Sequence, residues 1–182
     1  AGIEGTRPVL VEVQALLSPS AGGSPRRQVV GWDSGRLSML LAVLESRCGL
    51  SLGANDVYLN IAGGLRIAEP AADLAVAAAL ASAATDRPTD AETVYFGEVG
   101  LSGEVRQVAQ AEGRLREAQT LGFAAAVLPR RLARGGRPPV ALDGLRLTET
   151  GHLADLVASF AEKTVRRGGE GPARAAVAAK PA

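Results

Sequence analysis

One run of small apolar residues constrains this chain more than any other. From Gly63 to Ala84 it reads GGLRIAEPAADLAVAAALASAA, a glycine turn followed by a helix that is small and apolar on almost every face. The helix is predicted to begin near Glu69, because Pro70 suits a first helical position and Glu69 and Asp73 complement the helix dipole. Alanine side chains let neighbouring elements approach closely, so we expect this helix to make close contacts with other helices and with a sheet.

Composition indicates one core built from aliphatic side chains. Hydrophobic residues make up 47% of the 182 residues and aromatic residues only 3%. We expect one globular domain over residues 1–162, followed by a disordered basic tail over residues 163–182 that is rich in Gly, Pro, Ala and Arg. The tail carries five basic residues against Glu170, whereas the body has more acidic than basic residues. A uniformly basic nucleic-acid-binding body is therefore excluded, and only local patches could bind phosphate.

Hydrophobic periodicity predicts alternating strands and helices. Strands are expected at 6–19, 28–33 (pairing back on the first), 55–65, on either side of a GLSG turn within 93–108, at 124–129 and at 145–149. Helices are expected from Asp33 or Ser34 to Cys48, from about 69 to about 86, at 109–123 and at 152–160. The helix that leads through Gly122 into an apolar strand is typical of an α/β unit rather than a bundle. The predicted fold is α/β, with mixed sheets and packed helices.

The inventory of reactive side chains is short and excludes several kinds of site. The chain has one histidine, His152, one cysteine, Cys48, and two lysines, Lys163 and Lys180, both in the tail. No HExxH, CxxC or clustered-Asp pattern occurs, so no metal is predicted. No lysine follows a glycine turn in the body, which excludes a Walker-type phosphate loop there. His152 is interpreted as a surface or capping residue and Cys48 as a small buried hydrophobe.

Hydropathy gives no sign of a membrane protein. No charge-free apolar run reaches the roughly 18 residues that would indicate a membrane span. The N-terminus lacks the charged and apolar regions of a secretory signal. We therefore expect a cytoplasmic protein.

Three long runs carry a resemblance to a known family. They are GWDSGRLSMLLAVLESRCG, DVYLNIAGGLRIAEPAADLAVAAALASA and VYFGEVGLSGEVRQVAQAEGRLREAQTLGF. They resemble the C-terminal Lon-protease-like domain of the bacterial DNA repair family RadA, also called Sms, over about residues 6–162. The resemblance implies a fold like that of the Lon proteolytic domain.

The resemblance also implies a peptidase site without its catalytic groups. In Lon the nucleophile lies in a Gly-Pro-Ser-Ala-Gly run, which falls here on EPAAD, so that Ala71 stands at the nucleophile's position. Glu112 stands at the position of the family's lysine. A serine–lysine dyad needs both groups. The chain is therefore expected not to be an enzyme. The alternative is a divergent Lon-type serine peptidase using Ser102, which has no lysine or histidine close to it in the sequence to activate it.

Assembly and DNA are what the resemblance implies as function. RadA proteins form hexameric rings and use ATP to drive branch migration in homologous recombination. The implied partners are further copies of the chain in a homo-hexamer, single-stranded or branched DNA and a recombinase such as RecA, with no membrane. No cofactor is expected in this chain, because the resemblance assigns ATP, Mg and Zn to N-terminal zinc-finger and ATPase domains outside it.

Clusters of arginine are the candidate DNA contacts. They are Arg26, Arg27, Arg130, Arg131, Arg134 and Arg137. Repeating such clusters around a ring would concentrate positive charge for phosphate contacts. A solvated loop is the alternative for each cluster. Arg66 and Arg106 are expected to form salt bridges with Glu69 or Glu104 at least as readily as to contact DNA.

Overall fold

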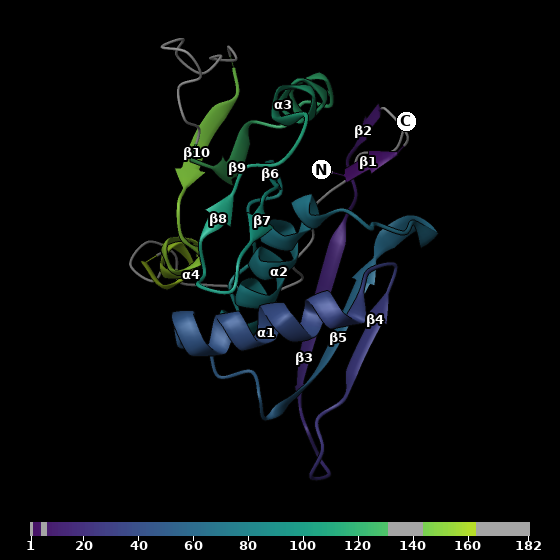
Figure 1. Ribbon diagram of the computed structural model, residues 1–182, viewed down its shortest axis with the longest axis vertical. Helices are drawn as coiled ribbons and strands as arrows, with labels where there is room; N and C mark the ends of the chain where they lie inside the picture. The colour runs from purple at the N-terminus through teal and green to yellow at the C-terminus, as the bar shows by residue number, and fades with distance from the viewer. Residues whose placement is uncertain (1, 5–6, 131–143, 163–182) are drawn as a thin grey trace.

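The computed structural model describes residues 2–4, 7–130 and 144–162, and its helices are interspersed among groups of strands along the chain (Figure 1). The strands are β1 (Gly2–Glu4), β2 (Arg7–Val9), β3 (Val13–Pro19), β4 (Arg27–Val30), β5 (Asn55–Ile61), β6 (Thr93–Tyr95), β7 (Glu98–Val99), β8 (Val105–Arg106), β9 (Ala125–Pro129) and β10 (Arg146–Thr150). The helices are α1 (Ser34–Cys48), α2 (Asp73–Thr85), α3 (Ala111–Thr120) and α4 (Leu153–Glu162), with short 3-10 turns η1 (Ala62–Gly64) and η2 (Pro70–Ala72). The predicted mixed α/β class is confirmed.

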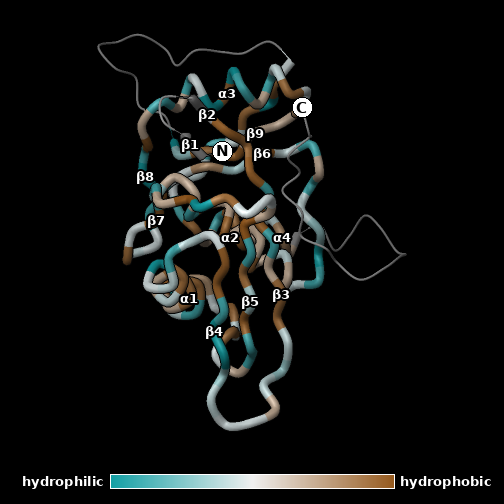
Figure 2. Tube along the Cα trace, turned by 90° about the vertical axis from the view of Figure 1, so that its right-hand side faces the viewer, coloured by the Kyte–Doolittle hydropathy of each residue, from teal (hydrophilic) through white to brown (hydrophobic). Residues whose placement is uncertain are grey.

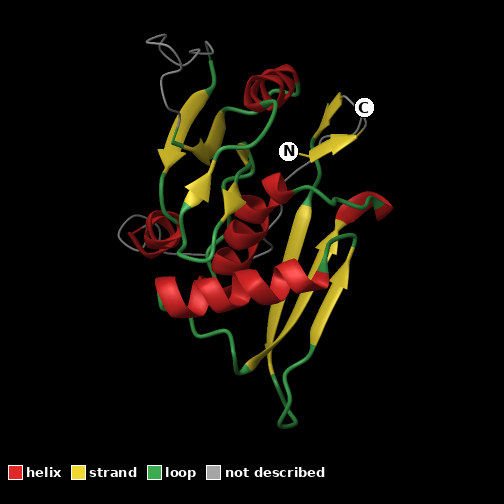
Figure 3. Ribbon diagram, viewed as in Figure 1, coloured by secondary structure: helices red, strands yellow, loops and turns green. Residues whose placement is uncertain are grey.

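The alanine helix α2 lies between the two larger sheets (Figure 3). One sheet has the strand order β3-β5-β4 and the other the order β10-β9-β6. Helix α2 contacts β3 of the first sheet and β6 of the second, and it also packs against α1 and α4. Every residue of α2 from Asp73 to Ser82 is buried. Its small side chains permit this approach from several sides at once, as the sequence predicted.

Helix α1 begins and ends where local signals predict. The Asp33 carboxylate accepts a hydrogen bond from the Arg36 backbone N–H at 2.7 Å, which caps the N-terminus. Gly49, with φ of 70°, ends the helix in the left-handed conformation that glycine adopts without strain. Cys48 is half-buried rather than fully buried, and this burial raises the pKa of its thiol.

Strand partners differ from the expectation in the first half of the chain. The predicted strand at 6–19 is divided into β2 and β3, and β4 does not pair back on it. Strand β5 lies between them, antiparallel to β3 and parallel to β4. Its alternate residues Val57, Leu59 and Ile61 are buried in the core cluster that also contains residues of α1 and α2, as expected for a central strand. In Figure 2 the loop between β3 and β4 extends below this sheet, at the lower end of the molecule.

The segment 93–108 also supplies two sheets rather than one hairpin. Strand β6 pairs in parallel with β9, and only β7 and β8 form the predicted hairpin, with Glu98 opposite Arg106. Gly103 occupies its turn with φ of 88°. The tail at 163–182 lies outside the described residues, so the domain boundary at residue 162 stays a prediction. Within the described ranges, no helix is long and apolar enough to cross a membrane.

Candidate functional site

The turn that carries Ala71 is docked firmly into the protein. Ala71 is 1% exposed and lies in η2, directly before α2. Its carbonyl accepts a hydrogen bond of 2.9 Å from the Gly97 N–H, and the Leu74 N–H donates to the Gly97 carbonyl at 3.1 Å. These two hydrogen bonds join the start of α2 to Gly97, which follows β6 and Phe96. The turn's backbone is therefore used to hold the fold together.

A partly buried ion pair holds this turn from one side. Asp73, the first residue of α2, is fully buried and accepts hydrogen bonds from the Arg36 guanidinium, one of them 2.9 Å from Nε to Oδ1. The Val99 N–H donates to the same carboxylate at 3.0 Å. Burial raises the pKa of the Asp73 carboxyl, and the hydrogen bond to Asp73 raises the pKa of Arg36. The pair links α1, α2 and β7.

A second ion pair holds the turn from the other side. The Arg114 side chain on α3 is buried, and its guanidinium donates to Glu69 in bidentate fashion, at 2.9 Å from Nη1 and 2.5 Å from Nη2. Its Nε donates to the Ala109 carbonyl at 3.1 Å. The expected pairing of Arg66 with Glu69 is therefore wrong, since Arg114 takes that carboxylate. The expected pairing of Arg106 with Glu104 is confirmed.

The GLSG loop offers a serine that is bound to a carboxylate. Ser102 is exposed, and its hydroxyl donates to Glu104. This hydrogen bond, helped by Arg106, lowers the pKa of Glu104 to about 2. The tertiary structure brings His152 beside the loop, where its backbone pairs with Glu104. A carboxylate with so low a pKa is a poor general base near neutral pH, which disfavours the peptidase alternative.

The position expected for the catalytic lysine holds an acidic residue, Glu112. Glu112 lies in the first turn of α3 and is exposed. Its acidic side chain offers no amine that could accept a proton from a nucleophile. The assignment of Ala71 and Glu112 to the positions of a lost dyad stays a prediction.

The three candidate DNA-contacting arginines that the structure describes lie at two separate sheets. Arg26 is exposed just before β4, whereas the Arg27 guanidinium donates to the carbonyls of Arg26 and Asn55. Arg130 is exposed and follows β9 in the second sheet. The structure does not bring the two clusters onto one element. The remaining candidates, Arg131, Arg134 and Arg137, lie outside the described residues.

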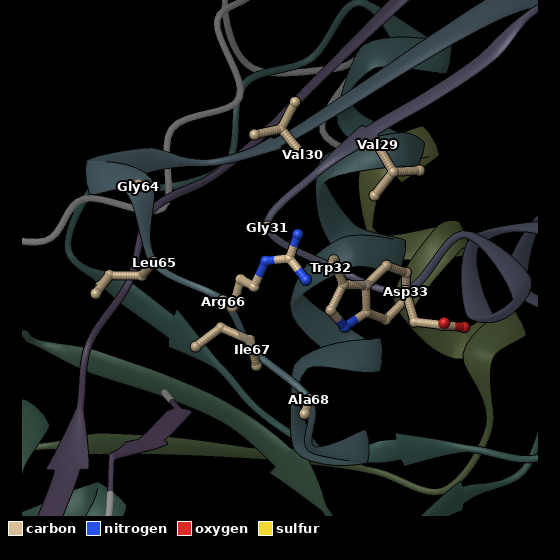
Figure 4. A pocket seen from close by; sticks show the side chains of 10 residues that line it. All are labelled: Val29, Val30, Gly31, Trp32, Asp33, Gly64, Leu65, Arg66, Ile67 and Ala68. Carbon is tan, nitrogen blue, oxygen red and sulfur yellow. The ribbon is translucent and has the colours of Figure 1, made fainter.

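A pocket that sequence analysis missed lies where β4 ends. It has a volume of about 560 Å³ and is formed by residues 29–33 and 64–68. Figure 4 shows the Arg66 guanidinium directed toward the Trp32 indole, with the Asp33 carboxylate pointing away from both. The indole Nε1 is buried, and no group among the described residues forms a hydrogen bond with it. The glycines at 31 and 64 and the chain's single tryptophan were the available signals, but none of them indicates a pocket by itself.

Comparison with known proteins bears on function. Residues 36–131 match the family described as subunit ChlI of Mg-chelatase. The DNA repair protein RadA of Brucella abortus is 58% identical over 162 residues, which are 88% of this chain and 34% of that protein. RadA of Rickettsia felis is 63% identical over 123 residues (68% of this chain, 28% of that protein), and RadA of Bacillus subtilis is 50% identical over 129 residues (71% and 28%). The predicted resemblance to RadA is confirmed, and the chain spans about a third of the length of these relatives.

Two expectations are corrected by these matches. The chain was expected not to be an enzyme and to hold no cofactor. The chelatase-subunit match points instead to an ATPase-type region within residues 36–131, for which a nucleotide and Mg would be expected.

The side chains of this region are poorly suited to such a ligand. Residues 1–162 contain no lysine. Among the described residues, no three His, Cys, Asp or Glu side chains are grouped so that they could hold a metal ion. Asp73, the buried carboxylate at the start of α2, is already bound by Arg36. The described side chains therefore do not fit a Mg-nucleotide site.

Proposed function

We propose a role in DNA repair and recombination from two findings: the chain belongs to the family described as subunit ChlI of Mg-chelatase, and it is similar to RadA proteins. The membership rests on residues 36–131, more than half of this chain, which match that family. In this proposal the chain assembles as a homo-hexamer in the bacterial cytoplasm. It contacts single-stranded or branched DNA and supports branch migration together with a recombinase such as RecA. The observation that carries the proposal is the 58% identity, over 88% of the chain, to a protein named for DNA repair.

Exposed arginines support contact with DNA. Arg26 and Arg130 are exposed, and within the described part of the chain neither guanidinium has a hydrogen-bond or ion-pair partner. Free guanidinium groups suit phosphate oxygens and carry no sequence preference. Arg27 is less suited, because two backbone carbonyls already accept from its guanidinium. Arg131, Arg134 and Arg137 continue the basic run after Arg130 in the sequence.

Charge reversal tests the DNA contact. The double variant Arg130→Glu with Arg131→Glu is compared with wild type by fluorescence anisotropy of a labelled oligothymidine over a salt titration. We expect weaker binding and a shallower dependence of affinity on salt, by about one unit of slope for each phosphate that is no longer neutralised. Arg116→Glu, on the exposed side of α3, is the matched control. Unchanged affinity at every salt concentration would remove this cluster from the proposal.

Light scattering tests the assembly. Coupled to size-exclusion chromatography over a range of protein concentrations, it is expected to show a six-subunit species, because closed rings are a common outcome of head-to-tail interfaces. A monomer at every concentration would contradict the ring. The two experiments are independent, since a monomer can still bind DNA.

A further inference from the structure

Strand β4 leaves part of its backbone open. It is an edge strand of the sheet β3-β5-β4, and the Val57 N–H of β5 donates to the Arg26 carbonyl at 2.8 Å. Backbone groups of successive residues in a strand point to alternate sides, so Arg26, Gln28 and Val30 face β5. Arg27 and Val29 consequently direct their N–H and C=O groups to the free side. Within the described residues, no other backbone group bonds to these two.

A short segment covers only the end of this edge. The Ile67 N–H donates to the Gly31 carbonyl at 2.9 Å, which is the next group on the free side after Val29. The preceding turn at Gly63 and Gly64, with φ of 79° and 70°, carries the chain from β5 to this end of β4, where the Leu65 carbonyl oxygen lies close to Gly31. One backbone bond is therefore made at the position where a full strand would make several. The pocket of about 560 Å³ lies beside this bond.

The pocket combines apolar, aromatic and cationic groups. Val30 is 58% exposed and Leu65 36% exposed, although both are apolar and line the pocket. Arg66 is exposed, and within the described part of the chain it has no ion-pair or hydrogen-bond partner. The Asp33 carboxylate does not neutralise Arg66, because it points away and caps α1 (Figure 4). These groups suit a ligand that carries an apolar side chain next to an acidic one.

From this arrangement we propose that the free edge of β4 binds an extended acidic peptide of a partner protein, which pairs with Arg27 and Val29 and places an apolar side chain beside Trp32 and an acidic one on Arg66. Addition of a strand to an exposed sheet edge is an established mode of peptide binding, in which the backbone supplies affinity and pockets supply specificity. Arg66 gives the pocket end of the edge a positive charge, and at the other end Arg26 and Arg27 together outnumber the carboxylate of Asp56 beside them. The chain's own tail is basic, so it is repelled from this edge. The proposal does not depend on the role in DNA repair.

Tryptophan fluorescence makes the binding measurable in the whole 182-residue chain. Trp32 is the only tryptophan, so its emission reports on the pocket alone. The probe is an acidic peptide without tryptophan, Ac-DEVEVDE-NH2, and the matched control peptide is Ac-KKVKVKK-NH2. We expect the acidic peptide to change Trp32 emission with saturation and the basic peptide to leave it unchanged. A response to the basic peptide equal to that of the acidic one would overturn the charge preference.

Backbone pairing is tested on the peptide, which avoids folding defects. Two versions of the acidic peptide are N-methylated, one at its odd and one at its even positions. A strand pairs through alternate residues only, so one version should lose binding and the other should keep it. Equal binding by both versions, whether both bind or neither does, would contradict pairing to the edge.

One substitution in the protein completes the test. Arg66→Glu is expected to weaken binding of the acidic peptide by about tenfold or more, because an attraction becomes a repulsion. Arg116→Glu, which carries the same change on α3, is expected to bind as wild type does. If a short oligothymidine saturates the Trp32 signal and the acidic peptide does not, the pocket binds nucleic acid and the peptide proposal is wrong.

Discussion

The first turn of α2 and the free edge of β4 use arginine in opposite ways. At the turn, Arg36 and Arg114 are bound to Asp73 and Glu69, and the Arg114 side chain is only 1% exposed. At the edge, Arg26 and Arg66 are exposed, and their guanidinium groups are not among the ion pairs of the described residues. Counting arginines therefore does not locate a binding surface. An arginine that completes an internal ion pair stabilises the fold, and only one left open to solvent can bind a ligand.

Helix α2 explains why the internal pairs are needed at that end. Its alanine side chains bury little area for each ordered residue, so the helix depends on close contacts and on its polar first turn. Asp73 suits the positive end of the helix dipole, and Arg36 and the Val99 N–H satisfy its buried oxygens. The arginines at the first turn of α2 therefore stabilise the fold, whereas those at the free edge of β4 are available to a ligand. Three substitutions test whether the two regions differ in this way, and a fourth tests the hydrogen bond between Ser102 and Glu104 in the GLSG loop.

Removing Arg114 should have the largest effect. Arg114→Met keeps much of the side chain's volume but leaves Glu69 without its cation, and we expect the free energy of unfolding to fall by about 3 kcal/mol. Urea denaturation followed by circular dichroism measures this loss. Arg116→Met on the exposed side of the same helix should change stability by less than about 0.5 kcal/mol. Equal losses in the two variants would show that Arg114 acts as any surface arginine does.

Substitution of Gly31, at the end of the free edge of β4, should have an intermediate effect on stability. Gly31 has φ of 79°, and a Cβ there would collide with the Leu65 carbonyl oxygen. Gly31→Ala is expected to lower stability by about 1–2 kcal/mol, because the residue is left-handed and the backbone must shift. Gly22→Ala is the control, since no atom lies within 4 Å of its Cβ position. Thermal unfolding that is the same for both variants would contradict the close approach of Leu65 to β4.

The half-buried residue Glu104 should show a smaller, pH-dependent effect. Its pKa is lowered to about 2, first by the hydrogen bond from Ser102 and further by Arg106. A lowered pKa means that this carboxylate contributes stability above its ordinary pKa of 4.5 and loses it as pH falls toward 2. Ser102→Ala should raise the pKa of Glu104 toward its ordinary value, measured by NMR titration of the side-chain carboxyl. An unchanged titration would show that Ser102 is not bound to Glu104 in solution.

Arg66 should have the smallest effect on stability. Because its guanidinium is exposed and makes no bond within the described residues, Arg66→Glu is expected to change the free energy of unfolding by less than about 0.5 kcal/mol. The same variant should nevertheless lose binding of the acidic peptide. A large loss of stability would place Arg66 with Arg114 among the residues that hold the fold, and would remove the contrast between the two regions.

Elements set by local signals were predicted well. The cap at Asp33 and the stop at Gly49 act within a few residues, and α1 occupies the predicted range. The passage from α3 through Gly122, with φ of 82°, into β9 is likewise confirmed. The burial of α2 follows from its composition. These features depend on backbone conformation and side-chain size at nearby positions, which the sequence states directly.

Partners over long separations were not predicted. Glu69 pairs with Arg114 across 45 positions, although Arg66 is three residues away. Nothing in a short window of sequence indicates which arginine reaches a carboxylate, because that depends on how α3 packs.

The expected absence of enzymatic function and of a cofactor was also wrong, and only the match to the chelatase subunit family corrected it.

The amino-acid sequence was sufficient to specify the kinds of element, the burial of the alanine helix, and the absence of lysine from residues 1–162. Packing in three dimensions was needed to establish that β5 separates β3 from β4, that β4 is left as an edge, and that Trp32 and Arg66 meet in one pocket. Helix periods and caps are properties of neighbouring residues. Strand order and side-chain partners are set by which surfaces pack together once the loops between them have closed.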